Sequence, residues 1–250
     1  MESEFRNKRY IITGASSGIG YAVMDQLLSD GAVVVGIGRD ASKIKMLLDK
    51  YSDDQLKFVS FDLSEVDKIE TMFESEIIQG IKFDGLVLCA GKEETLPLVL
   101  YKSDKVLDLF KINVFSGIEL LRIFTKKKVS NDGASIVFLS SVMSELGQAG
   151  KIGYCATKSA LLGVVKASAL ELQKRKIRVN AIAPGVVNTP MTEKLFSSLS
   201  IENVEEIESM HPSGFGDPSD IVPMIRFLLS GQSRWMTGQN INIDGGYSIR

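Results

Sequence analysis

The chain has 250 residues, of which 44% are apolar, and this length and composition can bury a full core in one large α/β domain. Its formal net charge of −2 provides no basic field, which argues against nucleic acid as a partner. The apolar runs are too short to span a membrane, and the acidic start of the sequence is unlike a secretory signal. One histidine and two cysteines offer little material for a metal site, and we expect reduced thiols in a cytoplasmic protein.

Short apolar strands alternate with helical segments along the chain. Strands are expected at residues 10–13, 32–37, 56–61, 84–90, 134–140, 177–183 and 240–244. Helices are expected after the first strand to about residue 30 and at 41–51, 64–78, 104–128, 154–174 and 217–229, with Ser64 as a possible N-cap. Because buried strands joined by helices pair in parallel, this order predicts an α/β fold with a doubly wound parallel sheet.

Tyr154 and Lys158 lie four residues apart in a predicted helix. This spacing puts both side chains on one face, about one turn apart. A nearby ammonium favours the phenolate and lowers the pKa of a phenol, which near 10 is too high for acid–base work at neutral pH. The same spacing also occurs by chance in helices, so the surrounding motifs decide the interpretation.

The glycine-rich segment 14–20 follows a strand and opens a helix. Glycines there permit a tight turn and let a pyrophosphate approach the free N–H groups of a helix N-terminus. The same residues also satisfy Gly-x-Ser-x-Gly, the nucleophile elbow of α/β-hydrolases, with Ser16 as the nucleophile. A hydrolase would need His211 as its base, and it would leave Tyr154 and Lys158 without a role.

Six segments, in order, resemble those of the short-chain dehydrogenase/reductase (SDR) family. Residues 13–20 resemble its cofactor loop, and Asp62 with Leu63 resembles its adenine-side pair. Residues 184–189 resemble its nicotinamide-side turn, and 237–239 with 244–246 its C-terminal signature. The resemblance covers nearly the whole chain, includes 3-oxoacyl-acyl-carrier-protein reductase-like members, and implies a single Rossmann-fold domain over residues 1–250.

The resemblance also implies a catalytic tetrad. Tyr154 would donate the proton, and Lys158 would lower its pKa and bind the nicotinamide ribose. Ser141 would hold the carbonyl oxygen, and Asn113 would position a water. The implied cofactor-binding residues are Gly14, Ser16, Ser17, Gly18, Ile19, Gly20, Arg39, Asp62, Leu63, Ala90, Gly91, Tyr154, Lys158, Pro184, Gly185, Val187 and Thr189.

Two positions bear on the cofactor. NAD-using relatives carry an acid at the end of the second strand, where this chain has Gly38 followed by Arg39. A guanidinium at a position without an acidic side chain can bind a 2′-phosphate, so we predict NADP(H) rather than NAD(H). The alternative is that Arg39 only pairs with Asp40. Where the family usually has Asn-Ala-Gly, this chain has Cys-Ala-Gly, beginning at Cys89. Replacement of the asparagine by Cys89 should weaken one hydrogen bond without removing catalysis.

The substrate side is less defined by sequence. Residues 188–216 are expected to form a lid, and residues 93, 94, 96 and 146–149 the rest of the pocket rim. The substrate would be a small carbonyl or alcohol compound, with sugars, steroids and small ketones left open. It could also be carried on an acyl carrier protein docked by Arg175 and the lysines at 126–128.

The remaining expectations concern role and assembly. A non-catalytic dinucleotide-binding protein is an alternative that the intact tetrad disfavours. His211 and Cys155 are expected to be structural rather than catalytic. The resemblance implies a homotetramer or homodimer that uses the helices at 104–128 and 154–174.

Overall fold

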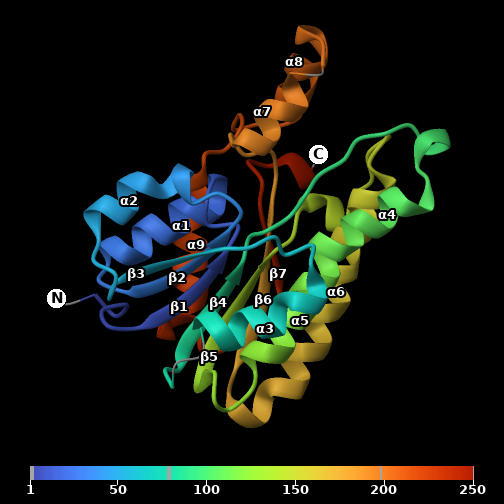
Figure 1. The fold of residues 1–250 in the computed structure, drawn as a ribbon. Coiled ribbons are helices and arrows are strands. Elements are labelled where there is room, and N and C mark those ends of the chain that lie inside the picture. The colour runs from blue at the N-terminus through green and yellow to red at the C-terminus, as the bar shows by residue number, and fades with distance from the viewer. Residues whose placement is uncertain (1–2, 78–79, 198, 250) are drawn as a thin grey trace.

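One sheet of seven parallel strands forms the centre of the fold (Figure 1). The computed structural model describes residues 3–77, 80–197 and 199–249. The strands lie in the order β3-β2-β1-β4-β5-β6-β7. Their bounds are β1 Arg9–Thr13, β2 Val33–Gly38, β3 Leu56–Ser60, β4 Phe83–Leu88, β5 Ser130–Leu139, β6 Arg178–Pro184 and β7 Asn240–Ile243. The order reverses between β1 and β4, and such a switch point is where α/β sheets bind ligands, at the carboxyl ends of the strands.

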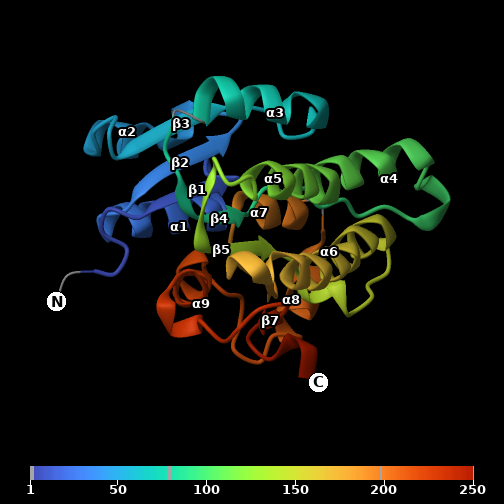
Figure 2. The same ribbon diagram turned by 90° about the horizontal axis from the view of Figure 1, so that it is seen from below.

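Helices cover both faces of the sheet (Figures 1 and 2). One face packs against α3, α5 and α6 through side chains such as Phe124 and Leu161, and the other against α1, α2 and α9 through Leu27 and Ile225. The helices are α1 Gly18–Ser29, α2 Lys45–Lys50, α3 Ile69–Met72, α4 Ser103–Phe110, α5 Ser116–Phe124, α6 Ile152–Glu171, α7 Pro190–Phe196, α8 Ile201–Ser209 and α9 Pro218–Leu229. None of these described helices is both long and apolar enough to cross a membrane. The predicted doubly wound parallel sheet is confirmed.

The helix predicted over 104–128 is shorter and contains an irregular turn. It runs through α4, a π-helical turn at Lys111–Phe115 and α5, and ends at Phe124. A π turn inserts one residue into a helix and is frequent at functional sites. Here the turn carries Asn113, which is buried.

The segment predicted as one helix over 64–78 is composite. It consists of a 3-10 turn at Val66–Lys68, the short α3 and a π-helical turn at Phe73–Ile77, and residue 78 lies outside the described residues. Ser64 is not the N-cap, because Glu65 holds that position before Val66, and the Ser64 backbone N–H donates to Asp62 Oδ1 at 2.9 Å. Asp62, and not Ser64, therefore provides the side chain that turns the chain after β3.

Candidate active site

The carboxyl ends of the strands bring distant segments of the sequence to one edge of the sheet (Figure 1). The glycine loop follows β1, Arg39 follows β2, and Asp62 with Leu63 follows β3. Ala90 and Gly91 follow β4, Ser141 follows β5, and the turn at 184–189 follows β6. All sequence-predicted cofactor segments therefore share this edge.

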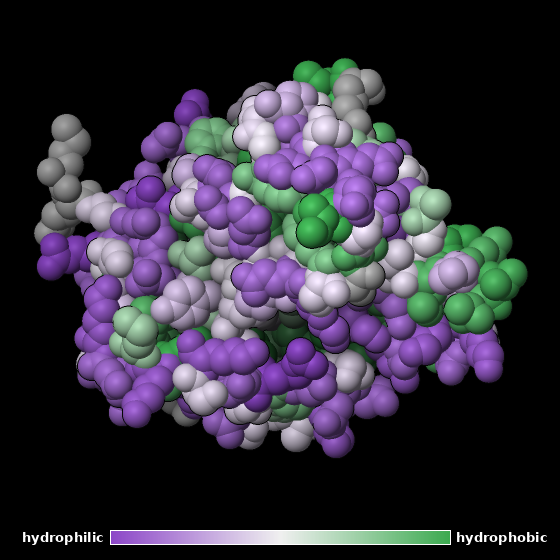
Figure 3. Space-filling view, turned by 90° about the horizontal axis from the view of Figure 1, so that it is seen from above, coloured by the Kyte–Doolittle hydropathy of each residue, from purple (hydrophilic) through white to green (hydrophobic). Residues whose placement is uncertain are grey.

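A pocket of about 140 Å³ opens at this edge. Figure 3 shows the molecule from above, with a hollow near the middle of this face. The residues predicted for catalysis or cofactor binding that line the pocket are Ile19, Gly91, Ser141, Tyr154, Lys158, Pro184, Gly185, Val187 and Thr189. The other residues predicted for these two roles, among them the loop glycines and Arg39, lie outside its lining. The pocket thus contains three members of the predicted tetrad but not the adenine side of the expected cofactor site.

Tyr154 and Lys158 occupy α6, with both side chains turned to the pocket. Burial raises the pKa of Tyr154 to about 12, although a hydrogen bond with the Ser141 side chain opposes this rise. Lys158 Nζ donates to the Leu139 carbonyl at 2.7 Å and lies 5.6 Å from the centre of the Tyr154 ring. Burial is the largest influence on the pKa of Tyr154 in this structure, and the expectation that Lys158 lowers this pKa stays a prediction. At neutral pH the phenol is protonated and therefore able to act as an acid.

Ser141 is held in place by its own turn. Its hydroxyl accepts from the Met143 backbone N–H at 3.2 Å and caps the 3-10 turn that follows β5. The same hydroxyl reaches the Tyr154 phenol. Two hydroxyl groups, from Ser141 and Tyr154, therefore meet at one point of the pocket wall.

Asn113 lies behind the pocket and anchors a loop. Its side chain accepts from Lys92 N at 2.8 Å, and its amide donates to Lys92 O at 2.9 Å and to Thr157 Oγ1 at 3.0 Å. It also borders a cavity of about 10 Å³, close to the smallest volume that can hold one water. These contacts fix the loop after β4 against α6, a role that sequence reasoning missed because Thr157 is distant in sequence.

The glycine loop has the shape that a dinucleotide requires. Gly14 has φ +65°, and a Cβ there would lie 2.9 Å from Ala90 N. A Cβ on Gly20 would lie 2.4 Å from Gly14 O, so the helix start packs directly on the turn. Ser17 is the N-cap of α1 but makes no side-chain cap bond, and Ser140 Oγ, in the pocket wall, is buried without a partner among the described residues. The residues present therefore fit a bound nicotinamide dinucleotide.

The end of β2 has no acidic side chain to bind a ribose. A Cβ on Gly38 would meet Ser16 Oγ at 3.0 Å and Phe58 at 3.1 Å, so the backbone is closely covered. Arg39 is exposed. Asp40 accepts from the Ser42 backbone N–H at 3.0 Å and from its hydroxyl at 2.6 Å, and no ion pair in the described ranges joins it to Arg39. The alternative in which Arg39 merely pairs with Asp40 is therefore not supported.

The predicted lid segment forms α7 and α8, which stand above the sheet edge (Figure 1). Thr189 starts α7 with a capping box to Thr192, whose hydroxyl donates to Val187 O at 2.7 Å. His211 lines the pocket, contacts the Ile207 carbonyl through Nδ1 at 2.8 Å and accepts from Val186 N at Nε2. Since the backbone engages both ring nitrogens, His211 is not arranged as the base of a hydrolase.

Comparisons with known proteins agree with this geometry. A family model described as Enoyl-(Acyl carrier protein) reductase matches residues 14–248. A 3-oxoacyl-(acyl-carrier-protein) reductase from Rickettsia bellii is 33% identical over 237 residues, which are 94% of this chain and 95% of that protein. The chain belongs to the SDR family.

Solved structures of other SDR enzymes share the fold. 4-Hydroxyisoleucine dehydrogenase complexed with NADH has a TM-score of 0.89 and 32% identity, covering 98% of this chain and 100% of that chain. A protein from Beutenbergia cavernae with bound NADP has a TM-score of 0.92 and 28% identity, covering 100% of both chains. The resemblance inferred from the motifs is confirmed, and the chain is an SDR oxidoreductase whose relatives use NAD(P).

The departure from the SDR motif at Cys89 lies in the pocket wall. Burial raises the pKa of this thiol to about 12, with Lys158 acting in the opposite direction. The thiol therefore stays protonated at neutral pH and is a poor nucleophile.

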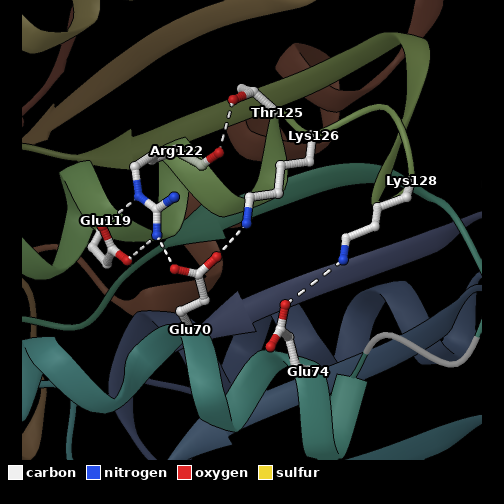
Figure 4. Close-up of polar contacts among 7 residues, drawn as sticks. All are labelled: Glu70, Glu74, Glu119, Arg122, Thr125, Lys126 and Lys128. Carbon is white, nitrogen blue, oxygen red and sulfur yellow. Dashed lines mark hydrogen bonds and ion pairs between the residues drawn. The ribbon is translucent and has the colours of Figure 1, made fainter.

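The basic residues considered for carrier docking lie at the wrong edge of this SDR fold. Lys126 pairs with Glu70, and Lys128 Nζ lies 3.7 Å from Glu74 (Figure 4). Arg175 Nε donates to Asp132 at 2.7 Å. These cations precede the starts of β5 and β6, whereas the pocket lies at the ends of the strands. The expectation that they dock a carrier protein at the active site is therefore not supported, because the parallel strands put these residues at the edge opposite the pocket.

The predicted rim is correct only in part. Glu93 and Gln148 line the pocket, but Glu94, Leu96 and the neighbours of Gln148 do not. Sequence reasoning missed Lys151, which also lines the pocket. Its position three residues before Tyr154, one helical turn away, was a signal that could have found it.

Proposed function

We propose that this chain is an NADP(H)-dependent oxidoreductase that reduces a carbonyl compound, or oxidises the matching alcohol, with Tyr154 as the general acid or base. The observation that carries the proposal is the meeting of the Ser141 and Tyr154 hydroxyls in the pocket beside Lys158. A non-catalytic dinucleotide-binding protein would have no need of these groups at one point.

When bound, the reduced nicotinamide supplies a hydride to the carbonyl carbon. Ser141 and Tyr154 hold the carbonyl oxygen by hydrogen bonds, which stabilise the negative charge that develops on it. Tyr154, protonated at neutral pH, then gives its proton to that oxygen. Lys158 holds the ribose hydroxyls and places a positive charge near the phenol as the proton leaves.

The glycine loop, Ser16, Ser17 and Ile19 bind the pyrophosphate side of the cofactor, and Asp62, Leu63 and Ala90 the adenine side. Arg39 binds the 2′-phosphate in this proposal. Two observations support this role of Arg39: its guanidinium is exposed, and the carboxylate of Asp40 accepts hydrogen bonds from Ser42 instead of pairing with Arg39. The remaining cofactor contacts are Gly91 and the turn formed by Pro184, Gly185, Val187 and Thr189.

Residues 188–216 act as the substrate lid. Met191, Leu195 and Phe196 of α7 and Ile207 of α8 face the pocket and provide an apolar cover. One candidate substrate, which the names of the relatives favour, is a 3-oxoacyl thioester, either free or attached to a carrier protein. Sugars, steroids and small ketones are the other candidates. The free thiols Cys89 and Cys155 support a cytoplasmic setting.

The enzyme assembles as a homodimer or homotetramer in this proposal. Exposed apolar side chains on α4, the π turn and α5 support it: Leu107, Phe115 and Ile118. Light scattering on the purified protein tests the assembly.

The test of function is oxidation of NADPH and NADH with a panel of ketones, 3-oxoacyl thioesters and sugars. We expect turnover with at least one class and a clear preference for NADPH. Cofactor binding without any turnover would favour the non-catalytic alternative. Labelling of Ser16 by a serine-directed phosphonate would support a hydrolase instead.

A further inference from the structure

An ion pair lies in the pocket wall next to Tyr154. Glu93, on the loop after β4, and Lys151, at the start of α6, approach to 3.3 Å between Nζ and Oε1. Each side chain is only 12% exposed, and both line the pocket together with Gln148. Lys151 Nζ also lies 5.9 Å from the centre of the Tyr154 ring. Both charges are therefore within the reach of one small substrate held at the phenol.

Other contacts besides the ion pair hold the two loops together. Leu96 N donates to Gly150 O at 2.8 Å, so the backbone already joins them. The Asn113 side chain is hydrogen-bonded to both the backbone N–H and the backbone carbonyl of Lys92, the residue before Glu93. A partly buried ion pair also adds little stability, because the loss of hydration offsets the attraction of the charges. The two charges thus face the pocket from loops that the backbone and Asn113 also hold in place.

The pair has the chemistry of a hydroxyl site. Glu93 Oε1 receives both the contact from Lys151 and a hydrogen bond from Thr95 Oγ1 at 2.6 Å. Within the described ranges no hydrogen bond involves Glu93 Oε2. A substrate carboxylate drawn to Lys151 would be repelled by Glu93, whereas a hydroxyl can accept from the ammonium and donate to the carboxylate together. A neutral hydroxyl therefore suits the pair better than an anion or a bare hydrocarbon.

We propose that Lys151 and Glu93 select carbonyl substrates that carry a hydroxyl group close to the reacting carbonyl, as hydroxyketones and ketoses do. The inference rests on the proposed function and names its substrate class. The two residues determine specificity, whereas Ser141 and Tyr154 hold the reacting oxygen. The apolar side chains of α7 cover the carbon skeleton on the other side.

The test compares 3-hydroxy-2-butanone with 2-butanone, which lacks only the hydroxyl, as substrates with NADPH. The wild-type enzyme should prefer the hydroxyketone in kcat/KM. Glu93→Gln and Lys151→Met should each reduce that preference by about 10- to 100-fold, because they should lower kcat/KM for the hydroxyketone much more than for 2-butanone. Lys105→Met is the matched control, since it breaks an adjacent ion pair, with Glu94 at 3.4 Å, outside the pocket.

Two outcomes would overturn the inference while leaving the proposed function intact. An equal loss with both ketones would make the pair structural. A preference for 2-oxobutanoate that disappears in Lys151→Met would make it a carboxylate site. The proposed function fails if no ketone is turned over, or if Tyr154→Phe does not remove the turnover. In that case the binding of alcohols, measured by ligand-observed NMR, decides the inference. Wild type should bind 2,3-butanediol more tightly than 2-butanol, and Glu93→Gln should not; equal binding by wild type would refute the hydroxyl site.

Discussion

The buried charge of Lys158 should make the stability of this protein depend on pH in a defined way. The side chain is 5% exposed, and burial lowers its pKa to about 8 from an ordinary value of 10.5. The unfolded chain therefore holds more protons than the folded protein between about pH 8 and 10.5. Stability contributed by this group must rise as pH rises through that window.

The size of the effect follows from the pKa. Lowering it from 10.5 to about 8 corresponds to roughly 3 kcal/mol of destabilisation while the lysine is charged. Between pH 7 and pH 9 only part of this is relieved, about 1 kcal/mol. Burial raises the pKa values of Cys89 and Tyr154 instead. Loss of the Lys158 charge would raise the pKa of Cys89 further, so both groups stay protonated in folded wild type and variant at pH 7 and pH 9, and their contributions cancel in the comparison.

The assay is urea unfolding of wild type and Lys158→Met at pH 7 and pH 9, followed by circular dichroism at one protein concentration. The free energy of unfolding of wild type minus that of Lys158→Met should be about 1 kcal/mol larger at pH 9 than at pH 7. Lys166→Met, which removes an exposed lysine from the same helix, should show no such change. A constant difference between wild type and Lys158→Met, or a change of opposite sign, would refute the reasoning.

Three further substitutions, one of them with a matched control, test separate parts of the site. Arg39→Ala should raise KM for NADPH about tenfold and leave KM for NADH unchanged, and an equal effect on both would remove the 2′-phosphate role. Gly20→Ala should cost about 1–3 kcal/mol in the free energy of unfolding, because its Cβ would lie 2.4 Å from a backbone oxygen. Gly163→Ala in α6, where a Cβ meets nothing within 4 Å, should instead be neutral or stabilise by up to about 1 kcal/mol, and similar losses in both variants would contradict the packing argument. Ser141→Ala should lower kcat by about 10²- to 10³-fold with unchanged cofactor affinity, whereas a normal kcat would exclude it from holding the oxygen.

The fold could be predicted because its signals are local. Continuous apolar runs that alternate with helical segments indicate a parallel sheet covered on both faces, and the parallel direction puts every loop that follows a strand at one edge. The glycine loop was equally readable, since Gly14 must adopt a positive φ and Gly20 must carry no side chain. These constraints act between residues that are close in sequence.

What the sequence did not show depends on contacts between distant residues. The lysines at 126 and 128 look like a docking surface until Glu70 and Glu74 are found beside them. The raised pKa of Tyr154 results from burial, which is a property of the folded pocket. The ion pair of Lys151 with Glu93 likewise joins two loops that only the sheet brings together.

The central claim is that Tyr154 supplies the proton when a carbonyl is reduced by NADPH. The most direct test uses NADPH deuterated at C4 and follows deuterium into the carbonyl carbon of a substrate from the panel. Wild type should transfer the label, and Tyr154→Phe should bind NADPH as before and transfer at least about a hundredfold more slowly. Transfer at the wild-type rate by Tyr154→Phe would contradict the account.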